Sequence, residues 1–112
     1  MTGAPAYGKR RDSNHKEILD LFVECGLRLP HITHMVVVDT ADLGGIVGDG
    51  IVQYFNSKYG SNAPLTTKLL EIKSGRKKKL TQAQINNPLL LTIIWDRKSV
   101  FETLCADDWE LV

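Results

Sequence analysis

Apolar residues occur in short runs whose spacing changes along the chain, and this pattern limits the possible folds more than any other feature. After Ser13, apolar residues recur every three or four positions, at Ile18, Leu21, Phe22 and Cys25, which predicts a helix. Later runs are too short for helices and are rich in β-branched residues, so they predict strands over 35–38, 51–55, 67–73 and 89–95. The chain therefore begins with a helix and continues into a sheet.

Residues typical of helix ends bound the expected helices. Asn14 can cap the first helix, with Glu17 at the third helical position, and Gly26 can end it. Thr81 can cap a short helix that stops before Pro88. A last helix is expected over 99–106, with its inward side formed by Val100, Phe101 and Leu104.

The expected order of elements is α-β-β-β-α-β-α, which predicts the α/β class with a mixed sheet flanked by helices. The apolar run over 89–95 is typical of a strand covered on both faces. With 112 residues, 43% of them apolar and 24% charged, the composition fits one globular domain and excludes disorder, collagen and coiled coil. We expect a mobile basic arm over 1–11 and a single domain over 12–112.

The formal net charge of +1 conceals an uneven distribution. Residues 1–79 hold 12 of the 14 Lys and Arg residues but 8 of the 13 Asp and Glu residues, which leaves the rest of the chain acidic. Much of the basic charge lies in two runs that could contact phosphates, although either run alone is more simply a solvated loop. The two runs are Lys9, Arg10 and Arg11, and Arg76, Lys77, Lys78 and Lys79.

Two acids and a lysine form the group of residues with the clearest chemistry. Glu71 and Lys73 are two positions apart in an expected strand, so their side chains point to one face. Asp49 begins the preceding strand, and if the two strands form a hairpin, its carboxylate converges with that of Glu71. Paired carboxylates suit Mg²⁺ or Mn²⁺, and a nearby lysine can stabilise negative charge at phosphorus. The group predicts metal-assisted phosphodiester hydrolysis.

Each member of this group, and the acid Glu17 of the expected first helix, also has a simpler interpretation. Glu-x-Lys is a common charge pattern on a half-exposed strand, and Asp49, between Gly48 and Gly50, could be an ordinary turn residue. Glu17, the acid of the first helix, could serve the cap of Asn14 and not a metal. Only the combination of these residues, in this order, is distinctive.

The same segments resemble the PD-(D/E)xK nucleases, and within them the VRR-Nuc (virus-type replication-repair nuclease) domains common in phage genomes. The resemblance runs from Arg11 to about Phe101 and is strongest where a Glu-x-Lys strand is followed by a basic linker and a Leu-Thr-x-x-Gln helix start. The segments that carry it are 11–18 (RDSNHKEI), 44–52 (GGIVGDGIV), 70–75 (LEIKSG), 80–84 (LTQAQ), 93–95 (IIW) and 99–101 (SVF).

The resemblance implies a restriction-endonuclease-like core and a metal-dependent DNA endonuclease. Asp49, Glu71 and the backbone carbonyl of Ile72 would hold Mg²⁺ or Mn²⁺, with Glu17 completing or orienting the shell. Lys73 would activate water and stabilise the transition state, and Gln84 would orient the lysine, the water or a phosphate. The implied substrate is branched or four-way-junction DNA in phage replication, recombination or repair, cut by a homodimer.

Three features of the chain depart from the family pattern. Gly48 replaces the proline before the aspartate, which we expect to loosen the turn without removing the ligand. The connection over 56–64 is longer than usual, and His15 stands where many relatives have another acid. None of these departures removes Asp49, Glu71 or Lys73.

Two other functions compete with the nuclease. A non-catalytic DNA-binding or packaging-associated protein would need the basic runs but not an intact acidic site. A metal protein using Cys25, His31 and His34 is disfavoured because their spacing matches no zinc signature. Two isolated cysteines, Cys25 and Cys105, fit a cytoplasmic protein with free thiols better than a disulfide framework.

Overall fold

A computed structural model describes residues 13–43, 47–60, 62–75, 79–87 and 89–107, so the expected arm over 1–11 lies outside the described residues. The elements follow one another in the predicted order, α-β-β-β-α-β-α, which confirms the fold class. They are α1 (His15–Arg28), β1 (Ile32–Asp39), β2 (Gly50–Asn56), β3 (Thr66–Ile72), α2 (Gln82–Ile85), β4 (Leu91–Ile94) and α3 (Arg97–Thr103), with 3₁₀ turns η1 (Ala41–Leu43) and η3 (Ser57–Tyr59). None of the helices in the described ranges is long and apolar enough to cross a membrane.

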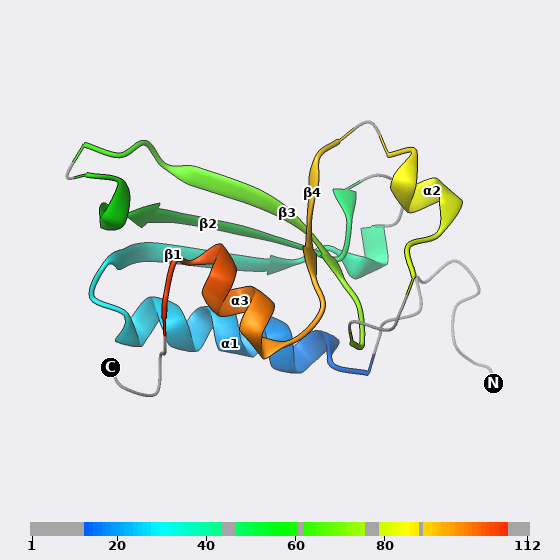
Figure 1. The fold of residues 1–112 in the computed structure, drawn as a ribbon, viewed down its shortest axis with the longest axis horizontal. Coiled ribbons are helices and arrows are strands. Elements are labelled where there is room, and N and C mark those ends of the chain that lie inside the picture. The colour runs from blue at the N-terminus through cyan, green and yellow to red at the C-terminus, as the bar shows by residue number, and fades with distance from the viewer. Residues whose placement is uncertain (1–12, 44–46, 61, 76–78, 88, 108–112) are drawn as a thin grey trace.

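The four strands form one mixed sheet in the order β1-β2-β3-β4 (Figure 1). Strands β1 and β3 each run antiparallel to β2, and β4 is parallel to β3. A parallel pair requires a crossover, and the connection that contains α2 provides it. The register places Asp39 beside Gly50 and Gly50 beside Leu70, so one end of the sheet joins the end of β1, the start of β2 and the end of β3.

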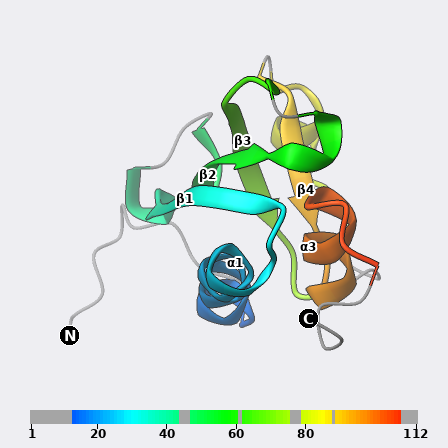
Figure 2. The same cartoon turned by 90° about the vertical axis from the view of Figure 1, so that its left-hand side faces the viewer.

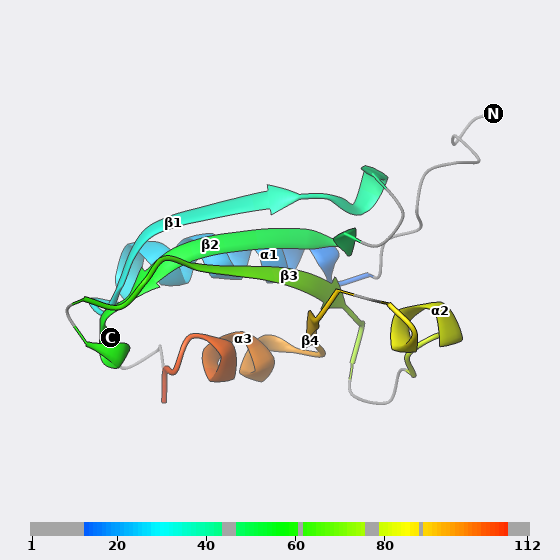
Figure 3. The same ribbon diagram turned by 90° about the horizontal axis from the view of Figure 1, so that it is seen from above.

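Both longer helices cover the same face of the sheet (Figure 2). Helix α1 packs chiefly against β1, and α3 packs against β4 and α1. The short α2 lies beyond the end of β3, apart from the other two helices (Figure 3). The core between the helices and the sheet is apolar, and its fully buried members include Ile18, Phe22, Cys25, Val52, Tyr54, Leu70, Ile72, Ile94, Val100 and Leu104.

Helix α1 differs from the prediction at both ends. It continues through Gly26 to Arg28. A Cβ at Gly26 would stand 2.4 Å from the Cβ of Met35, so this glycine allows close packing on β1 and does not end the helix. At the other end Asn14 occupies the cap position without a side-chain cap hydrogen bond. The expected capping pair with Glu17 is therefore not formed.

Strand β4 also differs from the prediction. It is shorter than the expected strand over 89–95 and it forms the edge of the sheet, where only Ile94 is buried. Leu90, just before it, is 94% exposed. Leu91, Thr92 and Ile93 are only partly buried, so the expected cover on both faces was wrong.

Helix α2 begins as predicted, whereas α3 (Arg97–Thr103) begins and ends before the expected helix over 99–106, although its inward side is the predicted one. Val100 and Leu104 are fully buried, and Phe101 packs against the core from a partly buried position. Thr81 caps α2: its hydroxyl accepts from the backbone N–H of Gln84, while the Gln84 Oε1 accepts from the backbone N–H of Thr81. This reciprocal pair is a capping box.

We expect Thr81→Ala to lower the free energy of unfolding by about 1 kcal/mol, because it removes one half of this capping box. Gln84→Glu should leave stability unchanged, since a Glu carboxylate accepts the same hydrogen bond from Thr81. Thermal unfolding of both variants checks the pair. Equal stability of Thr81→Ala and the unchanged protein would show that the box contributes nothing.

Candidate functional site

Asp49 is fixed beside Glu71 by two hydrogen bonds. Its backbone N–H donates to the carbonyl of Leu70 over 2.7 Å, and its carboxylate Oδ2 accepts from the backbone N–H of Ile72 over 2.8 Å. These partners are the residues directly before and after Glu71 in β3. The hairpin of β2 and β3 therefore places Asp49 and Glu71 on neighbouring strands at one end of the sheet.

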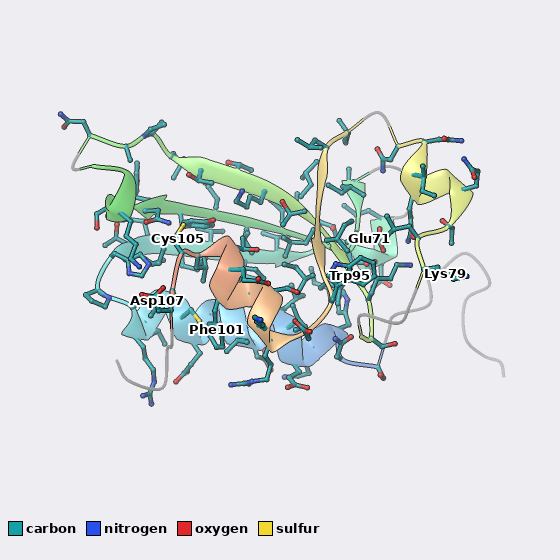
Figure 4. The ribbon with its side chains drawn as sticks, in the orientation of Figure 1. Glu71, Lys79, Trp95, Phe101, Cys105 and Asp107 are labelled. Carbon is teal, nitrogen blue, oxygen red and sulfur yellow. The ribbon has the colours of Figure 1, made fainter. Side chains whose placement is uncertain are left out.

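Glu71 and Lys73 follow the alternation of β3. Leu70 and Ile72 point into the core, so Glu71 lies on the face of the sheet away from the helices. Lys73 continues this alternation just past the strand, where its backbone N–H donates to the carbonyl of Ile94 over 2.9 Å. In Figure 4, Glu71 lies at the end of the sheet nearer α2, far from Cys105.

All three residues of the group are buried, which is unusual for charged side chains. The exposed fractions are 5% for Asp49, 3% for Glu71 and 8% for Lys73. On an ordinary half-exposed strand a Glu-x-Lys pattern stays in water, so this burial argues against the solvated charge pattern. A buried charge is costly without compensation, and charged groups kept close together in the interior are typical of functional sites.

The turn before Asp49 is tight, not loosened. Gly48 has a φ of +82°, and a Cβ there would stand 2.4 Å from the carbonyl oxygen of Leu70. Thr40 holds the same turn, because its hydroxyl donates to the Gly48 carbonyl over 3.0 Å and its N–H to the Asp49 carbonyl over 3.1 Å. Glycine is required by this geometry, and the expectation that it loosens the turn was wrong.

The start of α1 contacts the end of β3 through Asn14. Its amide Nδ2 donates to the carbonyl of Lys73 over 2.9 Å. The two residues are 59 positions apart, so no local pattern predicts the contact. It places the start of α1 against the backbone at the end of β3.

The structure does not bring Glu17 to Asp49 and Glu71. The Glu17 side chain is 59% exposed, and its carboxylate lies 3.9 Å from the guanidinium of Arg97. It lines a groove that Arg97 of α3 also lines. The described ranges contain no group of three or more His, Cys, Asp or Glu residues that could hold a metal ion. His15, at the start of α1, is buried, and its Nε2 lies 3.1 Å from Asp39 Oδ1.

The remaining predicted site residues are only partly placed. Gln84 uses its Oε1 in the capping box of α2, so that oxygen is engaged in holding the helix. Lys79 is exposed at the approach to α2. The other six residues of the basic runs, Lys9, Arg10, Arg11, Arg76, Lys77 and Lys78, lie outside the described residues.

The histidines and cysteines do not form a shared site. Cys25 lies in the core, where burial raises the pKa of its thiol to about 11 and keeps it protonated. The His31 ring hydrogen-bonds the Leu104 carbonyl over 2.8 Å, and His34 packs edge-on against Phe55. Each of these side chains therefore has a structural role of its own, which removes the alternative of a His/Cys metal protein.

The donor atoms at the acidic end of the sheet fit a hard divalent cation. Asp49 and Glu71 contribute carboxylate oxygens at neighbouring positions of two strands, and the Ile72 hydrogen bond fixes how the Asp49 carboxylate is turned. Mg²⁺ and Mn²⁺ bind through one or two carboxylates, with water and substrate phosphate completing the shell. Lys73 adds a cation on the same face of the strand.

Comparison with known proteins yields no relative of this chain. No family model, no curated protein and no solved structure matches it. The function is therefore inferred from the residues and their arrangement.

Proposed function

We propose that this protein is a metal-dependent DNA endonuclease that hydrolyses phosphodiester bonds in branched or four-way-junction DNA. The observation that carries the proposal is the hydrogen bond from the Ile72 amide to the Asp49 carboxylate, which holds this acid beside the buried Glu71. The resemblance of segments 44–52, 70–75 and 80–84 to VRR-Nuc domains supports the same activity.

In this proposal Asp49 and Glu71 hold Mg²⁺ or Mn²⁺, with the Ile72 carbonyl as a third oxygen. When bound, such an ion polarises a phosphate oxygen and lowers the pKa of a coordinated water. Lys73 stabilises the negative charge that develops on the phosphate, which is favourable in a site largely shielded from water. Gln84 would act only through its amide NH₂, because its oxygen serves the helix cap.

The proposed substrate follows from the basic runs. Their lysines and arginines would contact phosphates, which give position without sequence information. We therefore propose selection by DNA shape, in the cytoplasm, during phage replication, recombination or repair. A homodimer would place two sites for paired cuts.

The test is cleavage of labelled linear, flapped and four-way-junction DNA with Mg²⁺ or Mn²⁺. We expect nicks near the branch point and no cutting after chelation of the metal. If the protein binds these substrates but cuts none of them, the enzymatic proposal fails. The non-catalytic DNA-binding protein would then be the better description.

A salt titration tests the basic runs separately. We expect log K for DNA to fall linearly with log salt, and Lys77→Gln, Lys78→Gln and Lys79→Gln to reduce the slope by about 0.9 for each phosphate that the variant no longer neutralises. Lys98→Gln, in an exposed position on α3, is the control and should leave the slope unchanged. Affinity that does not depend on salt would exclude these lysines as phosphate contacts.

A further inference from the structure

Asn14 is the polar residue at the start of α1 that the structure places against the end of β3. Its amide NH₂ donates to the Lys73 carbonyl over 2.9 Å. That carbonyl can only accept, so the bond also fixes which end of the side-chain amide is nitrogen and which is oxygen. Asn14 makes no side-chain cap for α1, whose first turn is closed by backbone bonding from Ile18 to the Asn14 carbonyl.

The Lys73 peptide is held from two sides. Its N–H donates to the Ile94 carbonyl of β4, and its C=O accepts from Asn14 at the start of α1. The strand ends at Ile72, so without these two bonds the position of the lysine would not be fixed by the sheet. The Asn14 amide thus determines where the Lys73 side chain leaves the backbone.

The oxygen of the Asn14 side-chain amide provides a second observation. Its Oδ1 is buried, and among the described residues it has no hydrogen-bond partner. A buried acceptor without a partner is uncommon in folded proteins and calls for a specific explanation. Because oxygen and nitrogen share one carbon, this buried acceptor stands beside the same Lys73 peptide group and adds to the close packing of the α1 start on the end of β3.

We infer that Asn14 is a positioning residue for the proposed cleavage reaction, fixing the Lys73 peptide through its amide nitrogen. The inference rests on the proposed function. It assigns the contribution of α1 to the site to Asn14, in place of the exposed Glu17. It also gives Asn14 a role that its position at the helix start does not require.

Asn14→Asp distinguishes this role from a helix cap. Aspartate is as good a cap as asparagine and its charge suits a helix N-terminus, so a cap role predicts unchanged stability and unchanged cutting. A carboxylate cannot donate to the Lys73 carbonyl, so we expect kcat to fall about tenfold or more, with KM changed less than about twofold. Asn14→Ala should also lower kcat, because it removes the donor to the Lys73 carbonyl.

The control is Asn62→Asp, which makes the same change in an exposed position of the β2–β3 connection and should leave kcat and the thermal midpoint unchanged. An Asn14→Asp protein that cuts with the same kcat as the wild type would overturn the positioning role and leave the proposed function standing. A kcat loss that follows a matching loss of folded protein in thermal unfolding would also overturn it. A wild-type protein that binds DNA without cutting it would overturn the proposed function, and the inference with it.

Discussion

Asp49→Asn is expected to abolish most of the cleavage while leaving the fold and DNA binding intact. The amide oxygen of asparagine can still accept from the Ile72 N–H, so the β2–β3 contact is kept. The negative charge that binds the metal is lost, and removal of one preorganised electrostatic group typically costs on the order of 10²–10³-fold in kcat. Single-turnover cleavage of the junction substrate, beside thermal unfolding, measures the two effects separately.

Two further variants accompany Asp49→Asn, one expected to lose cleavage and one serving as the control. Lys73→Met keeps the length of the side chain and removes its charge, and it should lower cleavage to a similar degree. Asp107→Asn makes the same chemical change as Asp49→Asn at an exposed position beyond α3 and should cut normally. Equal cutting by Asp49→Asn and the wild type would contradict the assignment of Asp49 to the metal, whatever activity the protein has.

The parts of the fold that follow from local pattern could be predicted from the sequence. The three- and four-residue spacing from Ile18 to Cys25 marks the buried side of α1, and the β-branched runs mark β1 and β2. The alternation at Glu71 and its place on the strand beside Asp49 follow from strand geometry and one hairpin. These features depend on residues close together in the sequence, or on a single pairing of strands.

The parts that depend on distant contacts could not be predicted in the same way. Gly26 has the sequence features of a helix end, and only the approach of Met35 shows that it serves packing. An apolar run such as 89–95 fits either a central or an edge strand, and the difference lies in which strands pair. Asn14 and Glu17 are both plausible caps in the sequence, but the contact with Lys73 and the exposure of Glu17 are tertiary facts.

Gly48→Pro is expected to unfold or strongly destabilise the protein. Proline at this position would restore the Pro-Asp pair of the nuclease family, so the resemblance alone predicts that it is tolerated. The structure predicts the opposite, because Gly48 has a φ of +82° and proline fixes φ near about −65°. We expect a loss of about 3 kcal/mol or more in the free energy of unfolding, which for a chain of this size lowers the thermal midpoint by about 10 °C or more.

Alanine variants separate the backbone conformation from the close contact. Gly48→Ala combines a positive φ with a Cβ 2.4 Å from the Leu70 carbonyl, whereas Gly60→Ala has a positive φ with nothing within 4 Å. Both should destabilise, and Gly48→Ala should cost more because β3 must move away from the Asp49 turn. The same movement would disturb the Ile72–Asp49 bond, so Gly48→Ala should also lose cutting that Gly60→Ala keeps. A Gly48→Pro protein as stable as the wild type would mean that the turn adopts a negative φ, and that the geometry holding Asp49 beside Glu71 is not the one described.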